Sequence, residues 1–353
     1  MSLPDATPPS KRLRLGLWLP FVALGVLIAG WSAAWVWARG QAETRMDAAV
    51  ADLAKAGWRV TWKDRAIGGY PFRMDVTLTE PRLTGPSGWG LTAPRLEAEA
   101  YMHAITSWLV AAPAGITFIR PIGGPVAVKG ELIRASFTHP NAHPPSFSFE
   151  GVKLAFAPGP GAQPFGLASA GRFEFHTRAG PDDEGGVFTH LDDARADPAT
   201  LLGRVAGAKP VSMVWNATLT KMRAFAGATW PDAVRRWSDA GGRMTLREAG
   251  LTAGDAAIGV KSGSLAVEAD GRASGVLEVT LRQAPRGLAA LADLGLTPPE
   301  AAQAAALVVQ ARQGSATAND AIPATITFQA GRTTLGPVAL GPAPKVYDPA
   351  ARP

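Results

Sequence analysis

An uncharged stretch from Leu15 to Ala38 constrains this chain more than any other part of its sequence. It reads LGLWLPFVALGVLIAGWSAAWVWA, twenty-four residues without Asp, Glu, Lys or Arg. A helix rises about 1.5 Å per residue, so the stretch covers roughly 36 Å, enough to cross a hydrocarbon core of about 30 Å. We therefore expect a single transmembrane anchor over residues 13–38, with the rest of the folded chain on one side of the membrane.

The charges that flank the anchor predict its orientation. Lys11, Arg12 and Arg14 directly precede it, whereas the basic residues that follow it alternate with acidic ones. Because basic flanks stay in the cytoplasm, we expect a cytoplasmic N-terminus and a body on the opposite side. The Pro- and Ser-rich residues 1–12 predict a disordered cytoplasmic tail. Four tryptophans of the anchor are interpreted as members of the aromatic belts at the two membrane surfaces: Trp18, Trp31, Trp35 and Trp37.

A cleaved secretory signal is the alternative interpretation of the same stretch. Ser32-Ala33-Ala34 has the small residues of a cleavage site. The apolar region of a signal normally covers about 7–15 residues, which is shorter than this stretch. Tryptophans also crowd the supposed junction. The sequence thus favours an uncleaved anchor and leaves cleavage as an open question.

Composition excludes several classes of protein. The 353 residues contain no cysteine, which excludes disulfides, zinc–thiolate sites, iron–sulfur clusters and a cysteine nucleophile. The net charge of +6 comes from basic residues dispersed among acidic ones, without a basic stripe, so we expect no nucleic-acid partner. The 39 glycines and 30 prolines favour many turns and short elements over a helical bundle.

After Gly57 the spacing of the hydrophobic residues changes from the period of a helix to the two-residue period of a strand. Residues 39–57 predict a juxtamembrane amphipathic helix that ends at Gly57. The alternating segments 58–62 and 74–78 predict an antiparallel strand pair around a turn at Gly68-Gly69. Similar alternation predicts further strands over residues 91–102, 126–137, 147–156, 165–177, 211–220, 243–251, 257–269, 324–330 and 333–340, with a hairpin turn at Asp270-Gly271 before a strand with Leu277, Val279 and Leu281.

Helices are few in this pattern. Asp197-Pro198 predicts the start of a short helix to about residue 206, and Thr229 the start of another to residue 240. Two more are expected over 286–295 and 297–313. The fold class is therefore mainly β (α+β): an N-terminal transmembrane helix, then a large antiparallel, curved β-sheet domain over 58–344 with a few short packed helices, and a Pro-rich tail over 345–353.

Three short motifs follow one another in the body: Gly69-Tyr70-Pro71-Phe72-Arg73; Gly263-Ser264-Leu265 with Asp270-Gly271-Arg272; and Gly331-Arg332, Leu335-Gly336-Pro337, Leu340-Gly341-Pro342 and Pro344. Their order behind an N-terminal anchor resembles the domain-of-unknown-function 2125 family of alphaproteobacterial envelopes. The resemblance implies a periplasmic protein that crosses the membrane once or bears a signal sequence, and it supplies no catalytic residues. With an uncleaved anchor, we expect a single pass through the bacterial inner membrane. The repeated amphipathic strands also resemble, more loosely, AsmA-like envelope proteins, whose long sheets are thought to hold lipid.

Motifs that carry chemistry are missing from the sequence. His139 and His143 have the i,i+4 spacing of a metal pair, but Pro140 and Pro144-Pro145 place them in a loop, so we expect no metal site. Ser169 lacks the first glycine of a nucleophile elbow. The acidic residues at 182–184 and 192–193 are interpreted as parts of solvated turns. We expect no catalytic residue and no cofactor.

Aromatic residues near the anchor are the candidates for contact with lipid or membrane, together with one arginine: Trp58, Trp62, Phe72, Arg73 and Trp89. The leading hypothesis is a non-enzymatic protein that presents an apolar sheet face to lipid or another hydrophobic envelope component. An envelope-assembly scaffold with a fully packed sheet is the alternative. A hydrolase is the third hypothesis, disfavoured by the missing nucleophile and metal signatures.

Overall fold

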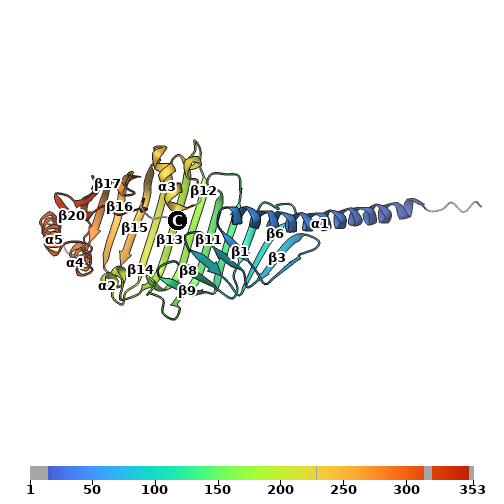
Figure 1. Cartoon of the computed structure of the whole chain (residues 1–353), viewed down its shortest axis with the longest axis horizontal. Coiled ribbons are helices and arrows are strands. Elements are labelled where there is room, and N and C mark those ends of the chain that lie inside the picture. The colour runs from blue at the N-terminus through green and yellow to red at the C-terminus, as the bar shows by residue number, and fades with distance from the viewer. Residues whose placement is uncertain (1–14, 228, 314–319, 350–353) are drawn as a thin grey trace, which may run out of the picture.

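A single long helix leads into the body of the protein. The computed structural model describes residues 15–227, 229–313 and 320–349, and α1 (Leu15–Lys55) covers both the predicted anchor and the predicted juxtamembrane helix without a break. Gly57, at φ +81°, follows its C-terminus, as expected for a glycine that ends a helix. Figure 1 shows the first half of α1 projecting from the body. The predicted tail 1–12 and the predicted start of the anchor at 13 lie outside the described residues.

Within the described residues, twenty strands form one antiparallel sheet. The first ten are β1 (Arg59–Thr61), β2 (Asp64–Gly68), β3 (Arg73–Thr79), β4 (Arg82–Thr84), β5 (Gly90–Thr92), β6 (Arg95–Tyr101), β7 (Trp108–Ala111), β8 (Ile116–Arg120), β9 (Gly124–Lys129) and β10 (Leu132–Thr138). The others are β11 (Ser146–Pro158), β12 (Leu167–Ala179), β13 (Gly185–Ala196), β14 (Val211–Leu219), β15 (Met244–Ala253), β16 (Ala256–Val267), β17 (Ala273–Arg282), β18 (Ile322–Gln329), β19 (Arg332–Leu335) and β20 (Val338–Pro342).

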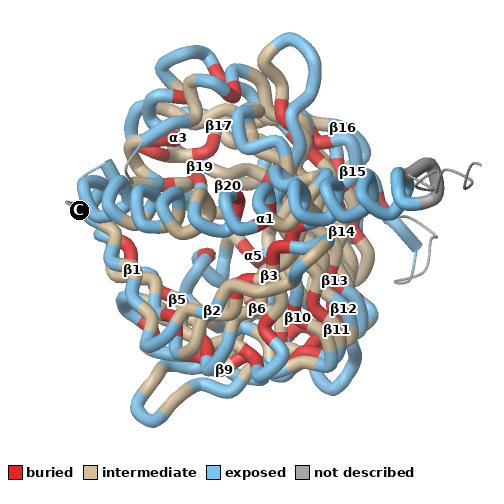
Figure 2. The backbone as a smooth tube through the Cα atoms, turned by 90° about the vertical axis from the view of Figure 1, so that its right-hand side faces the viewer, coloured by how far each residue is buried: buried red, intermediate tan, exposed pale blue. Residues whose placement is uncertain are grey.

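The sheet forks at β11. From β11 to β20 each strand pairs with the next in the chain. On its other side, residues 146–152 of β11 pair with β10, and residues 155–158 pair with β9. One branch then continues in the order β10-β7-β6-β3-β2 and the other in the order β9-β8-β5-β4-β1. Figure 2 shows the strands from β9 to β17 curving in a wide arc behind α1.

Short helices pack against the sheet at several of its strands. The remaining helices are α2 (Leu201–Ala206), α3 (Trp230–Asp239), α4 (Ala284–Asp293), α5 (Pro299–Gln313) and the 3-10 helix η1 (Met222–Ala224). Leu288 of α4 and Ala305 of α5 share a buried core with Val279 of β17. Trp237 of α3 is buried against Tyr347 near the C-terminal end of the described chain. The prediction of a mainly β fold with an apolar N-terminal helix and a few short helices is confirmed.

Strand pairing near the anchor differs from the prediction. The segments 58–62 and 74–78 were expected to pair with each other, but β1 pairs with β4, while β3 pairs with β2 and β6. The predicted turn at Gly68-Gly69 connects β2 to β3, so the hairpin begins at Asp64. Alternation identifies a strand and its buried face, but the partner depends on contacts between residues far apart in sequence.

The first residues of two helices can be compared with the helix starts predicted from the sequence. The helix predicted to start at Thr229 is α3, and Thr229 is its N-cap, since its hydroxyl accepts a hydrogen bond from the amide of Asp232. For α2 the predicted N-cap was wrong: the helix begins after Thr200, whose hydroxyl accepts from the amide of Gly203. Asp197 instead accepts from the amide of Ala199 at 2.8 Å, a local turn that competes with helix initiation.

Candidate functional site

One face of the sheet is apolar across thirteen neighbouring strands, from β2 through β3, β6, β7 and β10 to β11 and on to β18. Residues that lie directly opposite one another on neighbouring strands form a central row of one residue per strand: Ile67, Val76, Ala98, Val110, Ala135, Phe149, Phe175, Thr189, Trp215, Ala249, Val260, Val279 and Ala324. Thr189 is its one polar member. Because side chains alternate along a strand, all of these point to the same side of the sheet.

Two further rows flank the central one. On one flank, two residues away along most strands and three away on β15 and β16, where the register shifts, lie Trp108, Phe137, Phe147, Thr177, Val187, Ala217, Leu246, Gly263, Leu277 and Ile326, and Leu335 of β19 extends this row. On the opposite flank lie Ile133, Gly151, Phe173, Leu191, Met213, Leu251, Ile258, Leu281 and Ile322. We call the three rows together the apolar ribbon. Its direction is perpendicular to the strands, along the length of the body.

The middle of the apolar ribbon is only partly covered. At the end near α1, Trp35 and Ala38 are buried, as are Met74 and Val76 of β3. At the far end α4 and α5 pack on the sheet. Between them, on β10 to β14, the aromatic members stay half-buried, and Phe137 is 37% exposed. A sheet face with aromatic side chains open to this degree can accept an apolar ligand without unfolding.

Aromatic rings form the floor of that middle part. The ring centroids of Phe147 and Phe175 lie 6.1 Å apart, and those of Phe149 and Phe173 lie 5.8 Å apart, in tilted arrangements. Such separations are those of favourable aromatic pairs, which hold the rings in fixed positions. The floor is therefore an ordered surface and not a loose collection of side chains.

An apolar hollow lies at each end of the ribbon. The proximal hollow, of about 350 Å³, lies between α1 and the sheet and is lined by residues that include Trp37, Met46, Ala49, Ile105 and Trp108. The distal hollow, of about 240 Å³, lies under α2 and α4 and is lined by residues that include Leu201, Val205, Leu251, Ile258, Leu281 and Leu288. Trp108 belongs to both the proximal hollow and the ribbon, as Leu251, Ile258 and Leu281 do at the distal end.

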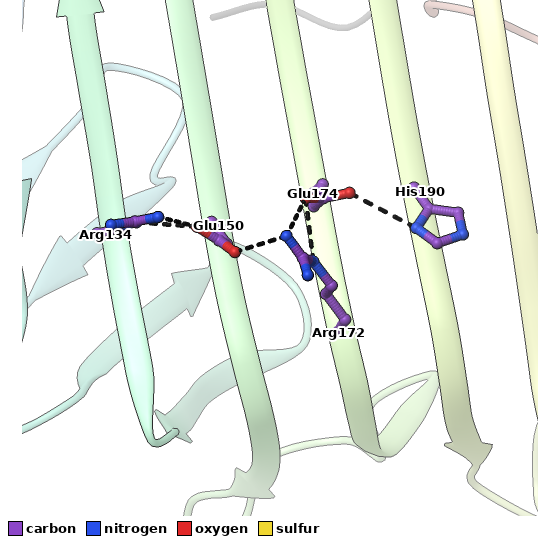
Figure 3. A network of polar contacts seen from close by, with 5 residues as sticks. All are labelled: Arg134, Glu150, Arg172, Glu174 and His190. Carbon is purple, nitrogen blue, oxygen red and sulfur yellow. Dashed lines mark hydrogen bonds and ion pairs between the residues drawn. The ribbon is translucent and has the colours of Figure 1, made fainter.

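The opposite face of the sheet carries a polar network (Figure 3). Glu150 of β11 accepts hydrogen bonds from Arg134 of β10 at 2.6 Å and from Arg172 of β12 at 2.8 Å. Arg172 also donates to Glu174 at 2.7 Å, and the Nδ1 atom of His190 lies 3.6 Å from the Glu174 carboxylate. The network joins four adjacent strands on the face that the apolar ribbon does not use. Its alternating charges serve to hold strands together, since each charge has an opposite neighbour.

We expect Glu150→Ala to lower the free energy of unfolding by about 1 kcal/mol at low salt, and by less at high salt. The change removes a carboxylate that two arginines share, and the Glu150 side chain is only 17% exposed. Denaturant unfolding followed by tryptophan fluorescence measures the difference. Glu131→Ala is the matched control, because that exposed carboxylate pairs only with Lys153 among the described ion pairs. Equal losses for the two variants would contradict a cooperative role of the network.

Displaced pKa values occur at exposed ion pairs away from the ribbon. A hydrogen bond from Lys209 lowers the pKa of Asp255 below its ordinary value, and a hydrogen bond to Glu131 raises the pKa of Lys153. In the part of the chain that the structure describes, no group of three or more His, Asp or Glu side chains could hold a metal ion. His139 and His143 lie in the loop between β10 and β11, as expected.

The candidate contact residues do not form one surface. Trp89 is exposed and stacks on Phe118 at 5.1 Å, in the branch that contains β4 and β5. Trp62 lies beneath the Arg65 guanidinium, 5.5 Å away, and Trp58 is half-buried. Phe72 and Arg73 lie apart from these, at the connection between β2 and β3.

The four tryptophans of α1 divide into two groups. Trp18 and Trp37 are 68% and 67% exposed, whereas Trp31 and Trp35 donate hydrogen bonds from Nε1 to the carbonyls of Pro71 and Arg73 at 2.7 and 2.9 Å, and Trp35 is only 7% exposed. Trp35 thus contacts the body of the protein where a lipid-facing belt residue was expected. Sequence spacing does not distinguish these two roles, because both use an indole at a helix end.

The helix itself fits a membrane anchor. From Trp18 onward it is long and apolar enough to cross a membrane, and its apolar part is almost wholly exposed on the protein. A signal sequence has the same properties.

Comparisons with known proteins agree with this architecture. A profile of a family described as "Uncharacterized protein conserved in bacteria (DUF2125)" matches residues 35–344, nearly the whole body and the end of the apolar stretch. Searches of curated proteins and of solved structures found no match. The match covers the three motifs that suggested this family and extends well beyond half of the chain. The chain belongs to the DUF2125 family of uncharacterised bacterial proteins.

Proposed function

We propose that this protein is anchored once in the bacterial inner membrane, with its body in the periplasm, and that the apolar ribbon holds acyl chains of lipid or a similar hydrophobic envelope component. It acts by binding and not by catalysis. The observation that carries the proposal is continuity: the ribbon begins at a hollow beside α1 and ends at a second hollow under α2 and α4.

The dimensions of the ribbon suit a lipid. Neighbouring strands lie about 4.8 Å apart, so the path across nine strands from β7 to β17 is roughly 38 Å long. An acyl chain spans half of a hydrocarbon core of about 30 Å. The ribbon is therefore long enough to hold an acyl chain over its entire length. Its proximal hollow begins at Trp37, next to the end of the apolar stretch, where a lipid leaves the bilayer.

An uncleaved anchor is favoured by its contacts with the body. Trp31 and Trp35 donate hydrogen bonds to the carbonyls of Pro71 and Arg73 at 2.7 and 2.9 Å. Cleavage after Ala34 would remove Trp31 and its hydrogen bond to Pro71, and it would make Trp35 the first residue of the chain that remains.

Native mass spectrometry of the full chain, purified from membranes in mild detergent, tests the proposal. We expect lipid to stay bound after the detergent is removed in the spectrometer, at about one or a few molecules per chain. Protein without any retained lipid would contradict the proposal. A protein partner captured by cross-linking, in the absence of retained lipid, would favour the envelope-assembly scaffold instead.

A further inference from the structure

The turn between β2 and β3 packs against the apolar half of α1. Trp31 donates a hydrogen bond to the carbonyl of Pro71, and the hydroxyls of Ser32 and Tyr70 lie 2.8 Å apart. The rings of Trp35 and Tyr70 meet edge to face at 5.5 Å. These contacts attach the turn, residues 69–72, to a segment of α1 that contains no charged residue. β3 lies at the end of the body from which α1 emerges (Figure 1).

The position of these contacts along α1 gives their depth relative to the hydrocarbon core of the membrane. If α1 spans the membrane as proposed above, Arg14 is the last charge before the hydrocarbon core. About 20 residues of helix cross the core at 1.5 Å each, so the far surface lies near residue 34. Trp31, Ser32 and Trp35 are therefore at that surface, and the turn that they hold is at the same level.

The side chains of the turn are suited to this level. Phe72 is 69% exposed and Tyr70 is also exposed. Tyr101 lies beside them, since the amide of Met102 donates to the carbonyl of Phe72, and it is exposed as well. Rings of this kind prefer the boundary between lipid headgroups and acyl chains.

Charged residues follow immediately behind the aromatic tip. Arg73 pairs with Asp75 at 3.4 Å and with Glu99 at 3.1 Å, so the ion-paired cluster begins at the residue directly after the exposed ring of Phe72. This order, with apolar rings first and paired charges next, matches the change from acyl chains to headgroups and water. A turn that bound a soluble protein would not need to lie against the membrane part of α1.

We propose that the turn over residues 69–72 inserts its aromatic side chains into the surface of the same bilayer that α1 crosses. The partner is the boundary region of phospholipids, and the inference rests on α1 acting as a membrane anchor. The bilayer then contacts both α1 and the turn, and these two contacts together fix the rotational orientation of the body about the axis of α1. The proximal hollow then keeps a constant orientation toward the membrane surface.

Single-cysteine labelling tests the proposal directly, because the chain has no cysteine of its own. Full-length Phe72→Cys, labelled with a nitroxide, is reconstituted into vesicles of phosphatidylethanolamine and phosphatidylglycerol. Leu24→Cys on α1 is the reference for the bilayer interior. Ile122→Cys, at a residue that is 86% exposed in the turn between β8 and β9, is the reference for water. Electron paramagnetic resonance then measures the accessibility of each label to oxygen and to a water-soluble nickel chelate.

We expect the ratio of oxygen to nickel accessibility at residue 72 to lie well above that at residue 122 and to approach that at residue 24. Equal ratios at residues 72 and 122, with residue 24 in the bilayer, would overturn the insertion of the turn and would leave the anchor unaffected. A label at residue 72 shielded from both reagents would indicate a protein partner and would also overturn it. A label at residue 24 in water would overturn both the anchor and the inserted turn.

Discussion

Phe137→Asp is expected to reduce the lipid retained by the purified chain by at least about tenfold. Phe137 lies in the flanking row between Trp108 and Phe147 and is the most exposed ring of the ribbon's middle part. A carboxylate there loses its hydration when an acyl chain covers it, and an uncompensated charge of this kind costs several kcal/mol. A tenfold change needs only about 1.4 kcal/mol. Quantitative lipid analysis of protein purified under identical conditions measures the loss.

Ser136→Asp provides the matched control for this variant. Ser136 is the preceding residue of β10, so its side chain points to the opposite face and lies opposite Ser148. The same charge is introduced into the same strand, but away from the ribbon, and lipid retention should stay unchanged. Circular dichroism and thermal unfolding of both variants confirm that they are folded. Loss of lipid in both variants, or in neither, would contradict binding on the apolar face.

Trp35→Ala is expected to lower the free energy of unfolding of the body by about 3–5 kcal/mol, the cost of removing a buried tryptophan. Trp35 is 7% exposed, contacts the Tyr70 ring and donates a hydrogen bond to the carbonyl of Arg73. Its removal leaves a cavity between α1 and β3 and an unpaired carbonyl. Denaturant unfolding in detergent measures the loss, and hydrogen exchange should show faster exchange at β2 and β3.

Trp37→Ala is the control for Trp35→Ala. The two tryptophans lie two residues apart in the same helix, but Trp37 is 67% exposed and has no hydrogen bond to the body in the described structure. We expect a change within about 0.5 kcal/mol for Trp37→Ala. A similar loss for both would mean that the length of the helix stabilises the body, and not the contact of Trp35 with β3.

The aromatic floor could be foreseen in part from the sequence. Phe147 and Phe149 alternate with polar residues, as do Phe173 and Phe175, so the strands and their apolar face were predicted. Alternation does not say that Phe149 lies opposite Phe175, because pairing between strands depends on turn geometry and on packing of the whole face. The candidate contact residues were chosen because they are aromatic, or next to an aromatic residue, and near the anchor in sequence, so no residue of the ribbon farther along the chain was among them.

β13 shows why one strand escaped prediction. Asp192 and Asp193 were interpreted as part of a solvated turn, but both lie within β13. The register shifts between Leu191 and Ala194, and Asp193 has φ +45°, so the strand contains a bulge there. A bulge interrupts the period of two and places two successive polar residues in a strand, which resembles a turn when only the sequence is considered.

The direction of the strands has a consequence for the size of the molecule. Because the strands run across the long axis of the body and α1 runs along it (Figure 1), the length of the body depends on the number of strands. From β11 to β20 neighbours in the sheet are also neighbours in the chain, so inserting one hairpin adds two strands without rearranging the others. Each such insertion would lengthen the body by about 9.6 Å while its cross-section stayed the same. The number of hairpins therefore sets the length of the body.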